Sequence, residues 1–220
     1  QLINKGYQLM TRPEEEIYDM LSETSQDSYC SKFIDKLLIP FVGLYKQCGY
    51  ELKHFETLIN ETEGNLRDQL YVMYDFLSYY DNELREKKLV DFEDMITSAY
   101  RIMPTIKEKN LGVDYKYLII DEYQDISSQR LNLVKEMSEL FDAKIMAVGD
   151  DWQSIFGYSG SRIDLFKDFS KYLKNAKSIP IENTYRNSQE LIDIAGDFIL
   201  KNENQIKKRL KSRKHINNPI

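Results

Sequence analysis

The sequence predicts an α/β protein in which a helical N-terminal subdomain precedes a parallel sheet with its connecting helices. Two observations carry this prediction. Up to about residue 88, apolar side chains recur at intervals of three or four, which is the spacing of one helix face. Beyond that point, short apolar runs alternate with helical patterns, and this alternation is typical of a parallel sheet.

The first 88 residues are expected to be helical throughout and to form one subdomain. The clearest apolar stripe comprises Leu66, Leu70, Met73, Leu77, Tyr80 and Leu84, which we expect to face a core. A second apolar stretch runs from Phe33 to Tyr45 and contains Pro40, which predicts a break or kink inside it. Nothing in this half resembles a phosphate-binding loop or a β alternation.

From Asp91 the pattern changes. Asp91 is an acidic cap for a helix whose apolar side comprises Phe92, Met95, Ile96, Ala99 and Met103. Three strands are then expected, at Tyr117–Ile120, Ile145–Val148 and Ser178–Ile181. Three helices are expected between and after these strands. Their apolar residues are Leu131, Val134, Met137 and Leu140 in the first; Ile163, Phe166, Phe169 and Leu173 in the second; and Leu191, Ile194, Ala195 and Phe198 in the third. A capping box of Asn187 and Glu190 is expected to open the third helix. We divide this half into residues 89–178 and 179–220.

Composition indicates a folded protein of the cell interior. Of the 220 residues 42% are hydrophobic, and no apolar run approaches the roughly 20 residues of a membrane helix. The first residues lack a secretory signal pattern, and Cys30 and Cys48 are expected to be reduced thiols. With only two histidines, a His-based zinc site is not expected. We therefore expect a cytoplasmic protein without membrane contacts.

The net charge of −6, taken alone, argues against a protein that is dedicated to coating nucleic acids. The segment from Lys201 to Lys214 is nevertheless basic, and a solvated face or tail is its simplest interpretation.

Each expected strand ends in a polar cluster, and ligands of parallel sheets bind at the carboxyl ends of strands. The first cluster is Asp121 to Asp125, with the sequence DEYQD. Here Asp121 could hold a magnesium ion, while Glu122 could accept a proton from an attacking water. A solvated turn is the alternative for two acids at a strand end, but Gln124 and Asp125 strengthen the functional interpretation.

The second cluster, residues 149–160, combines a glycine turn with an amide and two aromatic rings. The Gln153 amide could sense a phosphate oxygen. Phe156 and Tyr158 could stack on unpaired bases, with core packing as the alternative for these rings. In the third cluster, Thr184-Tyr185-Arg186, a guanidinium beside a helix start could stabilise a γ-phosphate, with a surface ion pair as the alternative.

The order of the three clusters resembles motifs II, III and IV of the UvrD/Rep-type superfamily 1 DNA helicases. The phrases DEYQDIS, AVGDDWQSI and YSGS, and the closing GDFILKNENQIKKRL, are most similar to the DNA helicase IV branch. The resemblance is specific over residues 89–214; over 1–88 it is positional. It implies a RecA-like P-loop NTPase sheet, with residues 1–88 as a helical 1B-like subdomain, 89–178 as the C-terminal part of motor domain 1A and 179–220 as the start of domain 2A.

The resemblance also implies roles for individual residues. Asp121 would order magnesium, and Glu122 would activate the water. Gln153 would link the γ-phosphate to the DNA site, and Arg186 would act as the arginine finger, while Gln124 and Tyr185 would belong to the nucleotide site, Tyr185 by stacking on the adenine. Phe156 and Tyr158 would stack on single-stranded DNA.

The sequence departs from the wider family at three positions and lacks one motif. Trp152 stands where many relatives have aspartate, although a tryptophan here fits the helicase IV branch. Gly157 and Ser159 stand where many relatives have arginine. No GxxxxGK[ST] loop occurs, so we expect the chain alone to bind triphosphates poorly and to be an inactive fragment, cut after that loop.

Three functions follow as hypotheses. The first is an ATP- and Mg²⁺-dependent DNA helicase or translocase on single-stranded DNA, which would act in DNA repair with repair proteins as partners. The second is an ATPase that remodels a protein such as RNA polymerase. The third is a metal-dependent nuclease built on Asp121, Glu122, Asp125, Asp150 and Asp151. A purely structural module leaves the order of the motifs unexplained.

Overall fold

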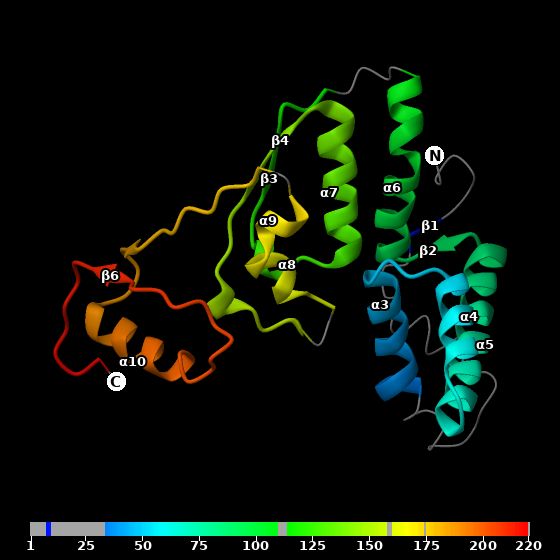
Figure 1. Cartoon of the computed structure of the whole chain (residues 1–220), viewed down its shortest axis with the longest axis horizontal. Helices are drawn as coiled ribbons and strands as arrows, with labels where there is room; N and C mark the ends of the chain where they lie inside the picture. Colours follow the sequence, from blue (N-terminus) through cyan, green and yellow to red (C-terminus); the bar gives the residue numbers. More distant parts are fainter. Residues whose placement is uncertain (1–7, 10–33, 110–113, 158–159, 174, 220) are drawn as a thin grey trace.

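The computed structural model describes residues 8–9, 34–109, 114–157, 160–173 and 175–219. A helical part with α3, α4 and α5 lies at one end of the molecule and α10 at the other (Figure 1). Between them lie α6, α7 and the strands β3 and β4. Within the described residues, no helix is both long and apolar enough to cross a membrane.

The helical part has its own core. It consists of the π-helix η2 (Ile34–Leu38), α3 (Ile39–Gln47), α4 (Leu52–Glu61) and α5 (Asn65–Lys87). The expected break near Pro40 is confirmed, because η2 changes to α3 there and the proline sits in the first turn of α3. The core residues are Val42, Tyr45, Phe55, Ile59, Leu70, Leu77, Tyr80 and Leu84. The α5 stripe is therefore confirmed, except that Leu66 is exposed.

Among the described residues of 1–88, the expectation of helix is wrong at Gln8–Leu9. Gln8–Leu9 form β1, which pairs in parallel with β2 (Leu89–Val90). The pairing joins two segments about eighty residues apart, and local periodicity carries no signal for such a contact.

A buried ion cluster connects the helical part to the next helix. The Asp91 side chain is buried and takes hydrogen bonds from Lys46 Nζ at 2.7 Å and from the Tyr80 hydroxyl at 2.9 Å. The same Lys46 ammonium lies 2.9 Å from Asp94 Oδ1. Asp91 also caps α6 (Phe92–Glu108) as expected, since its Oδ1 accepts from the Asp94 backbone N–H at 2.7 Å.

The buried side of α6 differs from the expected one. Met103 is buried, but Phe92 and Met95 are exposed. Instead, α6 packs on α7 (Ser128–Phe141) through polar groups: buried Gln129 donates to the Glu93 carbonyl at 2.7 Å and to Thr97 Oγ1 at 2.6 Å. Apolar periodicity could not reveal a contact made by these polar groups.

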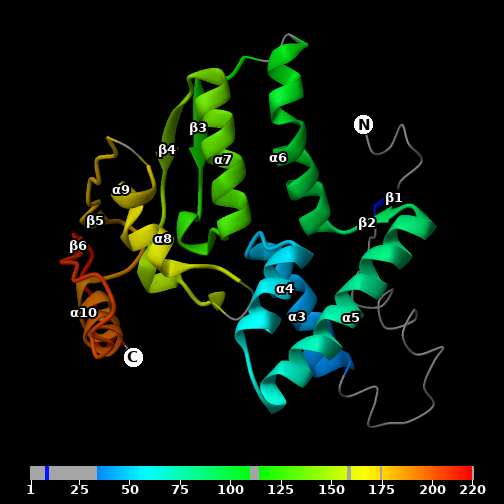
Figure 2. The same ribbon diagram turned by 45° about the vertical axis from the view of Figure 1, so that its right-hand side comes forward.

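The two central strands confirm the parallel arrangement. Tyr117–Ile120 form β3 as expected, and the second strand, β4, is Lys144–Ala147, one residue earlier than expected. They pair in parallel register, with Tyr117 opposite Lys144 and Ile120 opposite Ala147. Figures 1 and 2 both show α7 between these strands and α6. Tyr117, Ile119 and Met146 alternate onto an exposed face.

A second small core lies beneath the strand ends. It contains Tyr123, Ile126, Leu131 and Leu165. Tyr123 belongs to the short helix η3 (Tyr123–Asp125), and η4 (Asp151–Gln153) follows β4. The single helix expected from Ile163 to Leu173 is divided into α8 (Ile163–Lys167) and α9 (Phe169–Tyr172) at Asp168.

The C-terminal part differs most from expectation. Ser178–Ile181 form no strand, and Ile179 and Ile181 are exposed. The strand is β5 (Asn183–Thr184), paired in parallel with β6 (Lys211–Ser212). α10 (Gln189–Ile199) is capped by Ser188, whose hydroxyl accepts from the Leu191 N–H at 3.4 Å, and not by Asn187. Its buried residues are Ile192 and Gly196, whereas Ile194 and Phe198 of the expected face are exposed.

Candidate functional site

The first two polar clusters lie side by side because the strands that carry them are paired. Beyond the ends of β3 and β4, the Val148 N–H donates to the Ile120 carbonyl at 2.8 Å, and the Tyr123 N–H donates to the Val148 carbonyl at 2.9 Å. These bonds continue the pairing past the strands. The loops that begin at Asp121 and Gly149 therefore start next to one another.

The two acids after β3 are exposed and held by their own backbone. Glu122 has a left-handed backbone with φ 51°, and its N–H donates to Asp121 Oδ1 at 2.9 Å. This geometry is uncommon for a residue other than glycine, and it turns the chain sharply between the two carboxylates. Within the described residues, Asp121 Oδ2 makes no backbone hydrogen bond.

Gln124 joins the first cluster to the second. Its side chain is buried, with 1% of its surface exposed. Nε2 donates to Glu122 Oε2 at 2.7 Å, and Oε1 accepts from the Asp150 backbone N–H at 2.9 Å. Both ends of the amide are thus used within the protein, so that Gln124 holds Glu122 in place.

Gly149 packs closely against the Gln124 side chain, which joins the two clusters. A Cβ at Gly149 would lie 2.6 Å from Gln124 Oε1 and 2.8 Å from Phe166 Cε2. Only a residue without a side chain fits between them.

In the second cluster, Asp150 orients Gln153. Asp150 caps η4 by accepting from the Trp152 N–H at 3.1 Å, and its Oδ2 accepts from Gln153 Nε2 at 3.0 Å. Gln153 is exposed. An amide nitrogen carries two hydrogens, so one N–H of Gln153 and its carbonyl oxygen remain available to a ligand.

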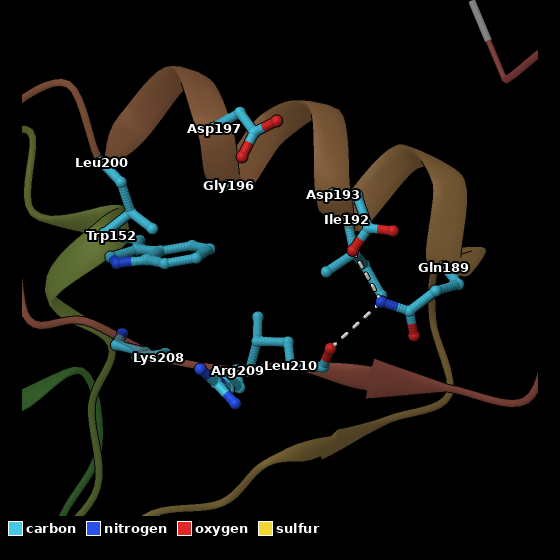
Figure 3. Close-up of a pocket in the computed structure, with 10 residues that line it drawn as sticks. All are labelled: Trp152, Gln189, Ile192, Asp193, Gly196, Asp197, Leu200, Lys208, Arg209 and Leu210. Atoms are coloured by element: carbon cyan, nitrogen blue, oxygen red, sulfur yellow. Dashed lines mark hydrogen bonds between the residues drawn. The ribbon is translucent and has the colours of Figure 1, made fainter.

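A contact that sequence reasoning missed fastens this cluster to the C-terminal part. The Lys208 ammonium pairs with the carboxylates of both Asp150 and Asp151, and the Asp151 side chain is fully buried. Trp152 lies between α10 and residues 208–210 (Figure 3). The only signal in the sequence was the basic segment itself, which gives no hint that one of its lysines is engaged.

Ionisation in the site follows from these contacts. Burial opposes ionisation of Asp150, but hydrogen bonds from Lys208 and Gln153 outweigh it and hold its pKa below the ordinary value. Burial, together with the charge of Glu122, raises the pKa of Asp125. Burial alone raises the pKa of Tyr123 to about 12, so this phenol stays neutral at physiological pH.

The expected base-stacking pair can be followed only in part. Phe156 has 42% of its surface exposed, so it is not a core residue of the described structure. Tyr158 lies outside the described residues.

The third cluster is accessible but separate from the first. Tyr185 has 70% of its surface exposed, and the Arg186 N–H donates to Thr184 Oγ1 at 3.4 Å. Over the described ranges, no hydrogen bond or ion pair connects Arg186 with Asp121 or Glu122, and no acid pairs with its guanidinium.

Asp121 is the exposed carboxylate of the site that fits a divalent ion shared with phosphates. In the part of the chain that the structure describes, no group of three or more His, Cys, Asp or Glu side chains is arranged to hold a metal. Asp121 offers a single exposed carboxylate at a strand end, and magnesium is often held by one or two carboxylates with substrate phosphates.

The sequence also matches a known family over most of its length. The family model described as the UvrD/REP helicase N-terminal domain matches residues 8–174. The chain belongs to this family. The match begins at residue 8, so UvrD/REP membership includes most of the helical part, over which the motifs themselves gave only a positional resemblance.

The individual relatives of this chain are also named as DNA helicases. The chain is 31% identical over 146 residues to DNA helicase IV of Escherichia coli (strain K12), covering 66% of this chain and 21% of the relative. It is 26% identical over 212 residues to the ATP-dependent DNA helicase PcrA of Bacillus subtilis (strain 168), covering 94% and 28%. The putative ATP-dependent DNA helicase YjcD of the same strain is 29% identical over 157 residues, covering 69% and 20%. The chain thus spans 20% to 28% of the length of these UvrD/REP relatives.

Proposed function

We propose that this chain supplies the water-activating part of the ATP site, and part of the DNA-binding surface, of an ATP-dependent DNA helicase or translocase on single-stranded DNA. The observation that carries the proposal is the Gln124 bridge, which ties Glu122 to Asp150 and so to Gln153. It is supported by membership of the UvrD/REP family. The division into a 1B-like subdomain (1–88), domain 1A (89–178) and the start of domain 2A (179–220) is part of this proposal.

Each residue has a defined task in this scheme. Asp121 is the carboxylate placed to hold Mg²⁺, which when bound neutralises phosphate charge. Glu122 accepts the proton of the attacking water, with Gln124 fixing one of its oxygens so that the other faces the water. Gln153 offers an N–H and a carbonyl oxygen to the γ-phosphate region. Tyr185 stacks on the adenine, and Arg186 stabilises charge on the transferred phosphoryl group.

The DNA contacts lie on the loop after η4. Phe156 and Tyr158 stack on successive bases, and because Gln153 is three residues before Phe156, a change at the phosphate reaches the base contacts over a short length of chain. We expect the 220-residue chain by itself to hydrolyse ATP poorly, since it contains no GxxxxGK[ST] loop.

The experiment that tests the function is ATP hydrolysis by the whole protein with and without single-stranded DNA. Turnover that rises with DNA supports a DNA motor. Turnover indifferent to DNA supports instead an ATPase that remodels a protein partner such as RNA polymerase. Cleavage of DNA in the absence of ATP would support the nuclease.

A further inference from the structure

Residues 205–208 are fastened to residues 150–152 by several contacts at once. The Ile206 N–H donates to Asp151 Oδ2 at 2.7 Å, and Trp152 Nε1 donates to the Ile206 carbonyl at 3.1 Å. When the Gln205 amide is turned so that its nitrogen faces Asp151, it donates to the same Oδ2 at 2.8 Å. The two segments are more than fifty residues apart in the sequence.

Lys208 supplies the charge that this arrangement needs. The fully buried Asp151 carboxylate requires a cation, because an unpaired buried charge costs free energy. The Lys208 ammonium pairs with it and with Asp150, and it lies 5.2 Å from the centre of the Trp152 ring. Only 22% of the Lys208 side chain is exposed. It is therefore not a solvated member of a basic tail.

α10 closes the arrangement from the other side of the indole. A Cβ at Gly196 would lie 3.3 Å from Trp152 Cη2, so the helix approaches the ring closely at this glycine. Figure 3 shows Trp152 with Gly196 above it and Lys208 below. A movement of α10 would therefore be transmitted to Trp152 and its neighbours by direct contact.

A single carboxylate connects Lys208 to Gln153. Asp150 Oδ1 takes the Lys208 ammonium and the Trp152 N–H, while Oδ2 takes Gln153 Nε2 at 3.0 Å. Removing the cation would leave Asp150 Oδ1 with the Trp152 backbone N–H alone, so Asp150, and through it the Gln153 amide, would be held less firmly.

We propose that Lys208 is a positioning residue for Gln153, acting through Asp150, so that the segment 205–208 sets which groups Gln153 presents to the nucleotide. The proposal rests on the proposed function, in which the target of Gln153 is an ATP phosphate.

The test compares Lys208→Met with Lys207→Met and with Lys208→Arg. Lys207 is exposed and makes no hydrogen bond or ion pair over the described ranges, so it is a matched control. The first readout is the side-chain amide NMR signal of Gln153 in the ¹⁵N-labelled chain, which needs no ligand. Lys208→Met should move this signal towards that of a solvated glutamine and speed its exchange with water. Lys207→Met should leave it unchanged, and Lys208→Arg should restore most of it.

The second readout is a double-mutant cycle on the ATPase activity of the whole protein. Lys208→Met should lower kcat by up to about 100-fold with little change in KM, as a misplaced active-site group does. In a Gln153→Ala background it should have little further effect, because its action passes through Gln153. An equal loss of kcat in both backgrounds would overturn the proposal.

If Lys208→Met does not fold, Asp150→Asn replaces it, since this variant breaks the link and keeps the Asp151 to Lys208 pair. An unmoved Gln153 amide signal in Asp150→Asn would also overturn the proposal. If the wild-type protein does not hydrolyse ATP, the proposed function fails, and the amide signal still decides whether Lys208 positions Gln153.

Discussion

Gln124 Oε1 accepts a hydrogen bond from the backbone N–H of Asp150 at 2.9 Å, across 26 residues of sequence. The other end of the same amide holds Glu122. The loop that carries the proposed base and the loop that carries Gln153 are therefore held by one buried side chain. A shift of either loop would therefore displace the other through the Gln124 side chain.

Gln124→Leu should remove this connection while nearly keeping the side-chain volume. It leaves the Asp150 N–H without its acceptor, which should lower the free energy of unfolding by roughly 1–3 kcal/mol. With Glu122 no longer held, kcat for ATP hydrolysis should fall by about tenfold or more. Denaturant unfolding and steady-state kinetics check the two parts. An unchanged kcat would mean that Gln124 does not orient the base.

Gly149→Ala should disturb the same place by crowding. The new methyl group would meet Gln124 Oε1 and Phe166, so we expect a loss of about 1–3 kcal/mol, the usual cost of overpacking. Gly43→Ala is the matched control, because a Cβ at Gly43 has no neighbour within 4 Å and the residue lies in α3. The control should be neutral or stabilising by up to about 1 kcal/mol. Equal thermal melting of Gly149→Ala and wild type would contradict the described packing.

Replacing both Phe156 and Tyr158 by alanine should weaken binding to single-stranded DNA. Each lost stacking contact is worth roughly 1–3 kcal/mol, so the affinity should fall by at least about tenfold, and DNA should no longer stimulate ATP hydrolysis. Because 42% of the Phe156 surface is exposed, the melting temperature should change little. Fluorescence anisotropy with a labelled oligonucleotide, beside a thermal melt, measures both. A large drop in melting temperature would indicate instead that these two rings pack in the core.

The pKa of Asp150 gives a prediction for pH. Its pKa is lowered in the folded chain, so the stability that it contributes is complete above its unfolded value of about 3.9 and is lost as pH falls through the folded value. Trp152, the single tryptophan of the sequence, contacts the Lys208 to Asp150 pair and reports on it. Its emission should be constant from about pH 8 to pH 5 and shift to the red only below about pH 4. Asp150→Asn has no carboxylate to protonate at this position, so it should show a weaker red shift below about pH 4 than the wild type. A wild-type transition centred above about pH 5 would argue against the pair.

The sequence predicted the parts of the fold that depend on local patterns. β3 and α7 follow apolar spacing and were placed correctly, and β4 was placed to within one residue. β1 pairs with β2 although the two strands lie at opposite ends of the helical part in the sequence. No local pattern predicts this pairing. Ser178–Ile181 carries a strand-like pattern but has no partner strand among the described residues, so it forms no ladder.

The site shows the same division. The residue types and order of the clusters at Asp121, Gly149 and Thr184 indicated the family, and the family match confirms it. What the sequence could not provide is the contacts between clusters. Nothing in the sequence indicated that Gln124 is buried between two loops and bonds to both. Lys208 was assigned to a solvated segment, but it neutralises Asp151. Both roles depend on which loops meet in three dimensions.

The most direct measurement is ATP binding and hydrolysis by Glu122→Gln in the whole protein, beside Glu139→Gln. Glu139 is exposed on α7 and makes no hydrogen bond or ion pair over the described residues, so it controls for loss of one negative charge. We expect Glu122→Gln to bind ATP as the wild type does but to hydrolyse it on the order of 100-fold more slowly, while Glu139→Gln is unaffected. Near-normal hydrolysis by Glu122→Gln would contradict the assignment of Glu122 as the base.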